Sequence, residues 1–170
     1  QVINGTYADA KDEPLAKTIQ SINAIDEAHM NLYVYNDEYP APGSEIPPEA
    51  SQNAHAKGII AYDNDTHSGI YIMHSFPKYP SVDTSGHINY ELPHTTDIYG
   101  QNLYCITLDK EILQQILSYL PLEKPHAYFA SGLFLNFHTD SKDNYTVTQF
   151  NLLNGDNQWL FTKNPKYPGF

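Results

Sequence analysis

The chain has 170 residues, of which 41% are hydrophobic and 13% aromatic, so it can bury a core as one domain and is not an intrinsically disordered chain. Its nine basic residues are all lysines and stand against twenty acidic residues, which gives a formal net charge of −11 at pH 7. This charge disfavours a DNA-binding module at neutral pH, because affinity for a polyanion rests on basic side chains that neutralise phosphates.

The first predicted element is a helix over about 13–25, with Pro14 in its first turn, where proline is tolerated. Apolar residues recur along it at helical spacing: Leu15, Ile19 and Ile22. The sequence then predicts a strand over 31–36 and a proline-rich loop over 39–50.

Two further strands, 55–63 and 69–75, are separated by residues 64–68, a spacing that favours a hairpin. The stretch 76–100 has no regular pattern and is predicted to be irregular.

A strand over 101–108 precedes Asp109, which is expected to cap a helix. The apolar positions of this helix are Ile112, Leu113, Ile116 and Leu117, and Pro121 and Pro125 are expected to end it. Residues 126–137 carry no pattern that assigns them. Two last strands are predicted over 145–153 and 158–163, which makes the whole a mixed α/β domain with helices packed on a central mixed sheet.

A His-x-Lys tripeptide, His55 to Lys57, begins one of these strands. Side chains alternate along a strand, so both residues are expected on one face, about 7 Å apart. A histidine beside a fixed positive charge suits phosphate chemistry, with the imidazole as nucleophile or acid. The alternative is a solvated strand end with two polar residues. Gly58 follows and allows close backbone approach, while Asp63 lies about 26 Å further along the strand and is expected to be a turn or support residue.

Eight histidines qualify the argument from charge. Their unperturbed pKa is about 6.5, so most would be charged in an acidic compartment. Protonation of all eight would change the formal charge from −11 to −3, which is compatible with a polyanionic partner at low pH. The alternative is that these are ordinary surface residues of a protein that never contacts nucleic acid.

No stretch approaches the ~20 apolar residues of a membrane helix, and the first residues do not form a signal peptide. Three N-glycosylation sequons begin at Asn4, Asn64 and Asn144. If they are occupied, the protein is secreted or lysosomal and has lost its targeting segment. Cys105 is the only cysteine, and it is either a small buried hydrophobe or the partner of a cysteine outside this chain.

Several blocks resemble deoxyribonuclease II, in the same order along the chain. They are His55-Ala56-Lys57-Gly58, His74-Ser75-Phe76-Pro77-Lys78-Tyr79-Pro80, Tyr99-Gly100-Gln101 with Cys105, and, less specifically, Tyr33-Val34-Tyr35-Asn36-Asp37 and Leu117-Ser118-Tyr119-Leu120-Pro121. The resemblance is clearest from about 31 to 120 and thinner elsewhere.

This resemblance implies a phospholipase-D-like fold, in which two similar half-domains each contribute one His-x-Lys to a shared groove. It also implies cleavage of DNA at acid pH, without a metal or other cofactor, through a phosphohistidine intermediate that leaves 3′-phosphate ends. His55 and Lys57 match one of the two motifs, and whether His55 is the nucleophile or the leaving-group acid stays open.

The resemblance also assigns a role to three further residues. His74 matches a histidine linked to activity in the family and is expected to support the site; the alternative is a core or strand-end histidine. Cys105 matches a cysteine that pairs with one near the N-terminus of the mature family members. Asn144 lies where the family also carries a sequon.

The chain has no second His-x-Lys. We therefore expect residues 1–170 to be a single domain equivalent to the N-terminal half of such an enzyme, without its N-terminal segment and its C-terminal half. The expected partners are DNA and either the remaining half of the protein or a second subunit, and no membrane. The alternative function is that of an inactive secreted homologue, a binding or antigenic glycoprotein.

Overall fold

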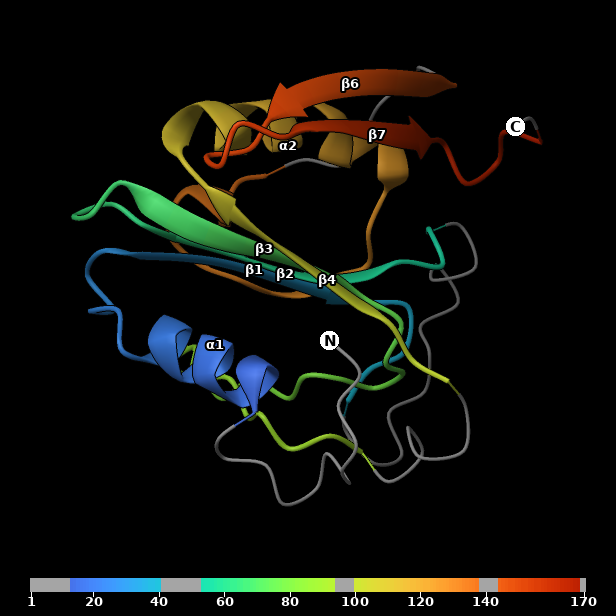
Figure 1. The fold of residues 1–170 in the computed structure, drawn as a ribbon. Coiled ribbons are helices and arrows are strands. Elements are labelled where there is room, and N and C mark those ends of the chain that lie inside the picture. The colour runs from blue at the N-terminus through green and yellow to red at the C-terminus, as the bar shows by residue number, and fades with distance from the viewer. Residues whose placement is uncertain (1–12, 41–52, 94–99, 138–143, 169–170) are drawn as a thin grey trace.

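The fold of this chain comes from a computed structural model, which describes residues 13–40, 53–93, 100–137 and 144–168 (Figure 1). Its helices are α1 (Pro14–Asn23) and α2 (Lys110–Glu123), with a short 3-10 helix at Gly132–Phe134. Its strands are β1 (Met30–Asn36), β2 (Lys57–Asp63), β3 (Ser68–His74), β4 (Leu103–Leu108), β5 (Ala127–Ala130), β6 (Tyr145–Asn151) and β7 (Asn157–Lys163). The predicted α/β class is confirmed.

Five strands form the central sheet, in the order β4-β3-β2-β1-β5. Every neighbouring pair in it is antiparallel, so the expectation of a mixed sheet is wrong. The reason lies in the connection through α2. It joins β4 to β5, which run in the same direction but lie at opposite edges of the sheet and therefore do not pair. Strands β6 and β7 form a separate antiparallel hairpin.

The sheet lies between two layers, with α1 on one face and α2 with the β6–β7 hairpin on the other (Figure 1). Alternation along the central strands supplies both cores. Tyr33 and Ile60 pack toward α2, whereas Val34 and Ile59 pack toward α1. Burial on both faces explains why β1 and β2 are continuous apolar runs rather than alternating patterns.

The two helices form where their caps and apolar spacing predict them. Helix α1 buries Leu15, Ile19 and Ile22 and ends at Asn23, two residues earlier than expected. At the start of α2, Asp109 Oδ1 accepts the backbone N–H of Ile112 at 2.8 Å, which is the predicted N-cap.

Pro121 does not end α2, contrary to the prediction. The helix runs through it to Glu123, with Leu120 and Leu122 both buried, and Lys124 then takes a left-handed conformation. Proline removes only one backbone N–H donor from the helix. The packing of the buried last turn outweighs the loss of that hydrogen bond. The backbone N–H of Lys124 returns to the carbonyl of Leu120 at 3.3 Å.

The other differences concern strand boundaries. The strand expected at 55–63 begins at Lys57, the one expected at 101–108 begins at Leu103, and the unassigned stretch 126–137 contains β5. Over the described part of 76–100 the structure has an isolated bridge between Val82 and Ile88, and no named helix or strand, as expected. Asp63 is the predicted turn residue: its carboxylate accepts the backbone N–H of Asp65 and the hydroxyl of Thr66.

Gly58 provides a stability test. A Cβ at this position would lie 2.5 Å from the Tyr35 hydroxyl, which is buried and hydrogen-bonded to the Tyr71 hydroxyl at 2.8 Å. We predict that Gly58→Ala lowers the free energy of unfolding by about 1–3 kcal/mol, measured by urea denaturation, because an overpacked core cannot relax without cost. Gly100→Ala is the matched control, since nothing lies within 4 Å of its Cβ position. Equal stability of the two variants would contradict the packing argument.

Candidate functional site

Three polar residues lie side by side at one end of the sheet, where hydrophobic residues would be the rule. Asn36 ends β1 and pairs with Lys57, the first residue of β2. The pairing of Gly58 with Met73 places Lys57 next to His74, the last residue of β3. All three are buried, and we call them the strand-end row. Alternation places the row on the α1 face of the sheet.

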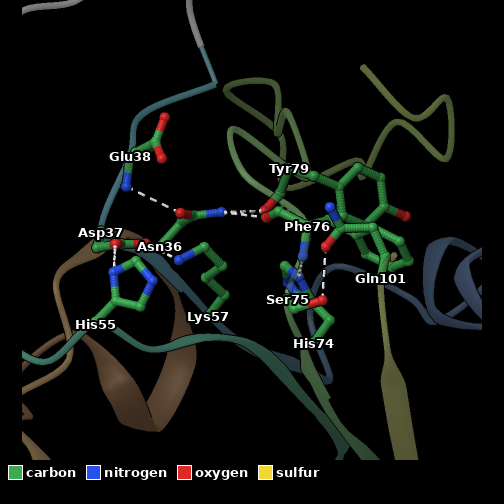
Figure 2. Close-up of polar contacts among 10 residues, drawn as sticks. All are labelled: Asn36, Asp37, Glu38, His55, Lys57, His74, Ser75, Phe76, Tyr79 and Gln101. Carbon is green, nitrogen blue, oxygen red and sulfur yellow. Dashed lines mark hydrogen bonds and ion pairs between the residues drawn. The ribbon is translucent and has the colours of Figure 1, made fainter. Parts of the chain in front are cut away.

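Asp37 follows this row directly and joins the two residues of the His-x-Lys tripeptide (Figure 2). One carboxylate oxygen accepts from the Lys57 ammonium, and the other contacts Nδ1 of His55. The Lys57 side chain is only 5% exposed, so its charge requires this partner. Asp37 thus positions both residues, and nothing in the sequence pattern assigned it that role.

His55 itself lies outside β2, contrary to the expectation that the strand begins there. The ladder ends at the Asn36–Lys57 pair because β1 turns away: the backbone N–H of Glu38 bonds to Oδ1 of Asn36 at 2.9 Å. His55 is brought to Lys57 by their shared contact with Asp37 rather than by strand alternation. Its side chain is 86% exposed, so the imidazole edge bearing Nε2 is open to a ligand.

Asn36 fixes the loop that covers the row. Its buried amide donates to the carbonyls of Phe76 at 3.1 Å and Tyr79 at 2.8 Å (Figure 2). Its backbone N–H donates to the carbonyl of His126 at 3.1 Å. One side chain therefore holds the loop after β3 against the end of β1.

His74 is buried beside Lys57 and supports this loop. Nδ1 accepts the backbone N–H of Phe76 at 3.2 Å, and the ring stacks on Phe76 and meets Tyr79 edge-on, each with centroids 5.5 Å apart. Burial, and then the charge of Lys57, lower the pKa of His74 from 6.5 to about 3. His74 therefore stays neutral at mildly acid pH, an exception to the expectation that the histidines gain charge in acid.

Two of the sequence blocks, the one that begins at His74 and the one that contains Gln101, are hydrogen-bonded to each other next to the strand-end row. The Ser75 hydroxyl donates to Oε1 of Gln101 at 2.6 Å and accepts the backbone N–H of Asn102 at 2.8 Å. These bonds tie the end of β3 to the start of β4, so the blocks at His74 and Gln101 have a common structural role.

Cys105, Asn64 and Asn144 are not among the residues of this site. Cys105 is exposed on β4, an edge strand, rather than a buried hydrophobe, and desolvation raises the pKa of its thiol. As the only cysteine of the sequence, it has no partner within the chain. Asn64 and Asn144 are exposed, whereas Asn4 lies outside the described residues.

Within residues 13–40, 53–93, 100–137 and 144–168, no group of three or more His, Cys, Asp or Glu side chains is placed to hold a metal ion. Neither α1 nor α2 has the length and apolar run that crossing a membrane requires.

Comparison with known proteins gives a match over nearly the whole chain. The family model for deoxyribonuclease II matches residues 3–166. Plancitoxin-1 of Acanthaster planci is 30% identical over 118 residues, which cover 69% of this chain and 31% of that protein. Deoxyribonuclease-2-beta of Rattus norvegicus is 33% identical over 116 residues, which cover 67% of this chain and 30% of that protein.

Deoxyribonuclease-2-alpha of Rattus norvegicus is 30% identical over 102 residues, 60% of this chain and 27% of that protein. The matched part of this chain thus spans about a third or less of each of these relatives.

The depressed pKa of His74 predicts a pH dependence of stability. Below its unfolded pKa of 6.5 the unfolded chain binds a proton that the folded chain does not bind until about pH 3. The contribution of His74 to stability is therefore lost as the pH falls from about 6.5 to 3. We predict that His74→Gln changes the slope of the unfolding free energy against pH, between pH 6 and 4, by about 1.4 kcal/mol per unit.

The measurement is urea denaturation at several pH values. The control is His67→Asn, which removes an exposed histidine from a turn position with φ 53°, a conformation that asparagine tolerates. If His74→Gln and His67→Asn change the slope equally, His74 is not held neutral by the fold.

Proposed function

Because this chain belongs to the deoxyribonuclease II family, we propose that it carries one half of a site that cleaves DNA phosphodiesters. The observation that carries the proposal is the cluster of His55, Asp37 and Lys57, in which an exposed imidazole shares one carboxylate with a buried lysine. In this proposal His55 and Lys57 contact or polarise the phosphate, and His74 supports them.

Asp37 prepares the imidazole for either of its two chemical roles. By accepting from Nδ1 it selects the tautomer whose Nε2 lone pair points away from the protein, and it stabilises the imidazolium once Nε2 has reacted. The same contact fixes the ring against rotation, which lowers the entropic cost of placing Nε2 against phosphorus.

Lys57 supplies a fixed positive charge beside the reacting group. It is held by Asp37 in a poorly solvated position, where a charge acts over a longer range than in water. Negative charge develops on the non-bridging oxygens as phosphorus becomes five-coordinate, and Lys57 stabilises that charge more than it stabilises the ground state.

The proposed reaction has two steps that need two histidines. One Nε2 attacks phosphorus and forms a P–N bond while the P–O5′ bond breaks, and the second histidine gives the 5′ oxygen its proton. Water then hydrolyses the P–N bond, which leaves a 3′-phosphate and the free histidine. The geometry around His55 fits either role.

The second His-x-Lys has to come from outside this sequence, which contains one. We propose that it belongs to the remaining part of the same protein, since the relatives are about three times as long as the matched region, or else to a second subunit. The proposed mechanism uses no metal or other cofactor.

The proposed setting is the secretory route, with the protein secreted or lysosomal. Asn64 and Asn144 are exposed at the ends of strands and accessible to glycosylation. Cys105 on its edge strand is accessible to a cysteine from another segment or chain. Acid conditions would also reduce the net negative charge that opposes DNA binding.

The direct test is nicking of supercoiled plasmid by the full natural protein at pH 5 in EDTA. We expect cleavage to 3′-phosphate ends and a loss of about 10²-fold or more in His55→Ala, because proton transfer alone contributes about 10²–10⁴-fold. Exposed His67, changed to Asn, is the control and should retain activity. Cleavage that requires added metal would contradict the proposal.

A second candidate function is that of an inactive secreted homologue, a binding or antigenic glycoprotein. The net charge of −11, the absence of arginine and the single His-x-Lys favour it. Retention of DNA by the full natural protein at pH 5, without any cleavage, would select this function over the nuclease.

The role of Asp37 gives a sharper prediction. Asp37→Asn keeps the shape but removes the charge that orients His55, so we expect kcat to fall by about 10²-fold or more with a smaller change in KM. The adjacent Glu38→Gln is the matched control, because the structure uses the backbone N–H of Glu38 rather than its carboxylate at this site. Asp37→Asn also leaves the buried charge of Lys57 without compensation, which reduces stability, so circular dichroism must show a folded variant before kcat is interpreted. Equal activities of Asp37→Asn and Glu38→Gln would exclude the positioning role.

A further inference from the structure

A pocket of about 500 Å³ opens beside His55, on the side of the sheet that faces α2. Its walls come from three parts of the fold: the segment before β2, the end of β3, and the β6–β7 hairpin with the last residue of α2. The polar groups that line it are Asn53, His55, Tyr71, Glu123, Thr162 and Lys163. A volume of this size fits a drug-sized or nucleotide-sized ligand.

Glu123 is the unexpected member of this lining. It is the last residue of α2, where the helix dipole disfavours negative charge, and among the described residues no basic side chain forms an ion pair with it. Burial raises its pKa from 4.5 to about 7. The carboxyl group is therefore neutral in acid and can donate a hydrogen bond into the pocket.

The surroundings of Glu123 contain few groups that could compensate its charge. Four tyrosines of β1, β3 and α2 lie near it: burial raises the pKa of each, and the negative charge of Glu123 raises it further, for Tyr33, Tyr35, Tyr71 and Tyr119. His55 and Lys163 also line the pocket, and the Lys163 ammonium already donates to the carbonyl of Tyr167 at 3.2 Å. Lys124 follows Glu123 in the chain.

We propose that this pocket, defined by His55, Glu123 and Lys163, is a subsite for the nucleotide next to the phosphate at His55, with Glu123 as the group that recognises it. The inference rests on the proposed nuclease function. The protonated carboxyl of Glu123 donates a hydrogen bond to an acceptor of the nucleotide, and the ammonium of Lys163, which also lines the pocket, attracts the neighbouring phosphate. When Glu123 ionises, it loses this donor and repels the strand.

A consequence is that DNA affinity depends on the protonation of one residue. If only the neutral form of Glu123 accepts the strand, the competent fraction falls from nearly all of the protein at pH 5 to about a tenth at pH 8. The dissociation constant then rises about tenfold from this cause alone.

The test measures binding without cleavage. A rhodamine-labelled DNA duplex is titrated with the full-length protein by fluorescence anisotropy at pH 5 and pH 8, with the parent and all variants made in a His55→Ala background so that the DNA is bound without being cleaved. We expect the ratio of Kd at pH 8 to Kd at pH 5 to be about tenfold smaller in Glu123→Gln, whose amide is a permanent neutral donor. Glu111→Gln, an exposed change in the first turn of the same helix, should keep the parent ratio.

A second variant tests occupancy of the pocket itself. Ala54→Trp fills the pocket from the segment before β2 and should raise Kd at pH 5 by about tenfold or more, in the same background. Urea denaturation checks that each variant is folded. It carries its own expectation: Glu123→Gln should make the slope of the unfolding free energy against pH more positive between about pH 4.5 and 7, because it removes the loss of stability that ionisation of Glu123 contributes there.

The outcomes separate the two proposals. If the parent protein binds DNA at pH 5 but Glu123→Gln keeps its pH ratio, or Ala54→Trp binds normally, the subsite is overturned and the nuclease proposal stands. If the protein with His55 intact neither binds nor cleaves DNA at pH 5, the nuclease proposal fails and the subsite fails with it.

Discussion

The ion pair between Lys57 and Asp37 is the constraint on which the site depends. A lysine at the first position of a central strand is almost fully buried, and an uncompensated charge there would cost several kcal/mol. Asp37 compensates it because β1 ends one residue earlier, opposite Lys57 in the sheet register. The second oxygen of the same carboxylate contacts His55. The residue that compensates the charge of the buried lysine therefore also positions the exposed imidazole.

Two other titratable groups, the buried His74 and the half-buried Glu123, oppose each other in their dependence on pH. His74 lowers stability as the pH falls from about 6.5 to 3, and Glu123 lowers it as the pH rises from about 4.5 to 7. Between about pH 4.5 and 6.5 the folded chain has one proton more at Glu123 and one fewer at His74 than the unfolded chain, so the two slopes cancel. These two residues alone give a plateau of stability in the mildly acid range, where the proposed reaction takes place.

The sequence predicted most helices and strands and the candidate site residues His55, Lys57 and His74, but it did not predict the roles of Asp37 and Glu123. Helical spacing at Leu15, Ile19 and Ile22 and the cap at Asp109 are local signals, and the structure follows them. Asp37 and Glu123 carry no local signal, because their importance comes from what the sheet register and the end of α2 place next to them. Packing around the last turn of α2 likewise overrode the local signal of Pro121.

The burial of His74 also bears on which residue can act as the second histidine of the proposed reaction. A histidine that acts as the leaving-group acid must be an imidazolium at mildly acid pH and must reach the oxygen that departs opposite the attacking atom. His74 meets neither condition, since it is a neutral imidazole above about pH 3 and lies under the loop that Asn36 holds in place. In the proposed mechanism, therefore, His74 cannot be the second histidine that acts together with His55. A second imidazole has to approach from the open side of His55, beside the pocket that Glu123 lines.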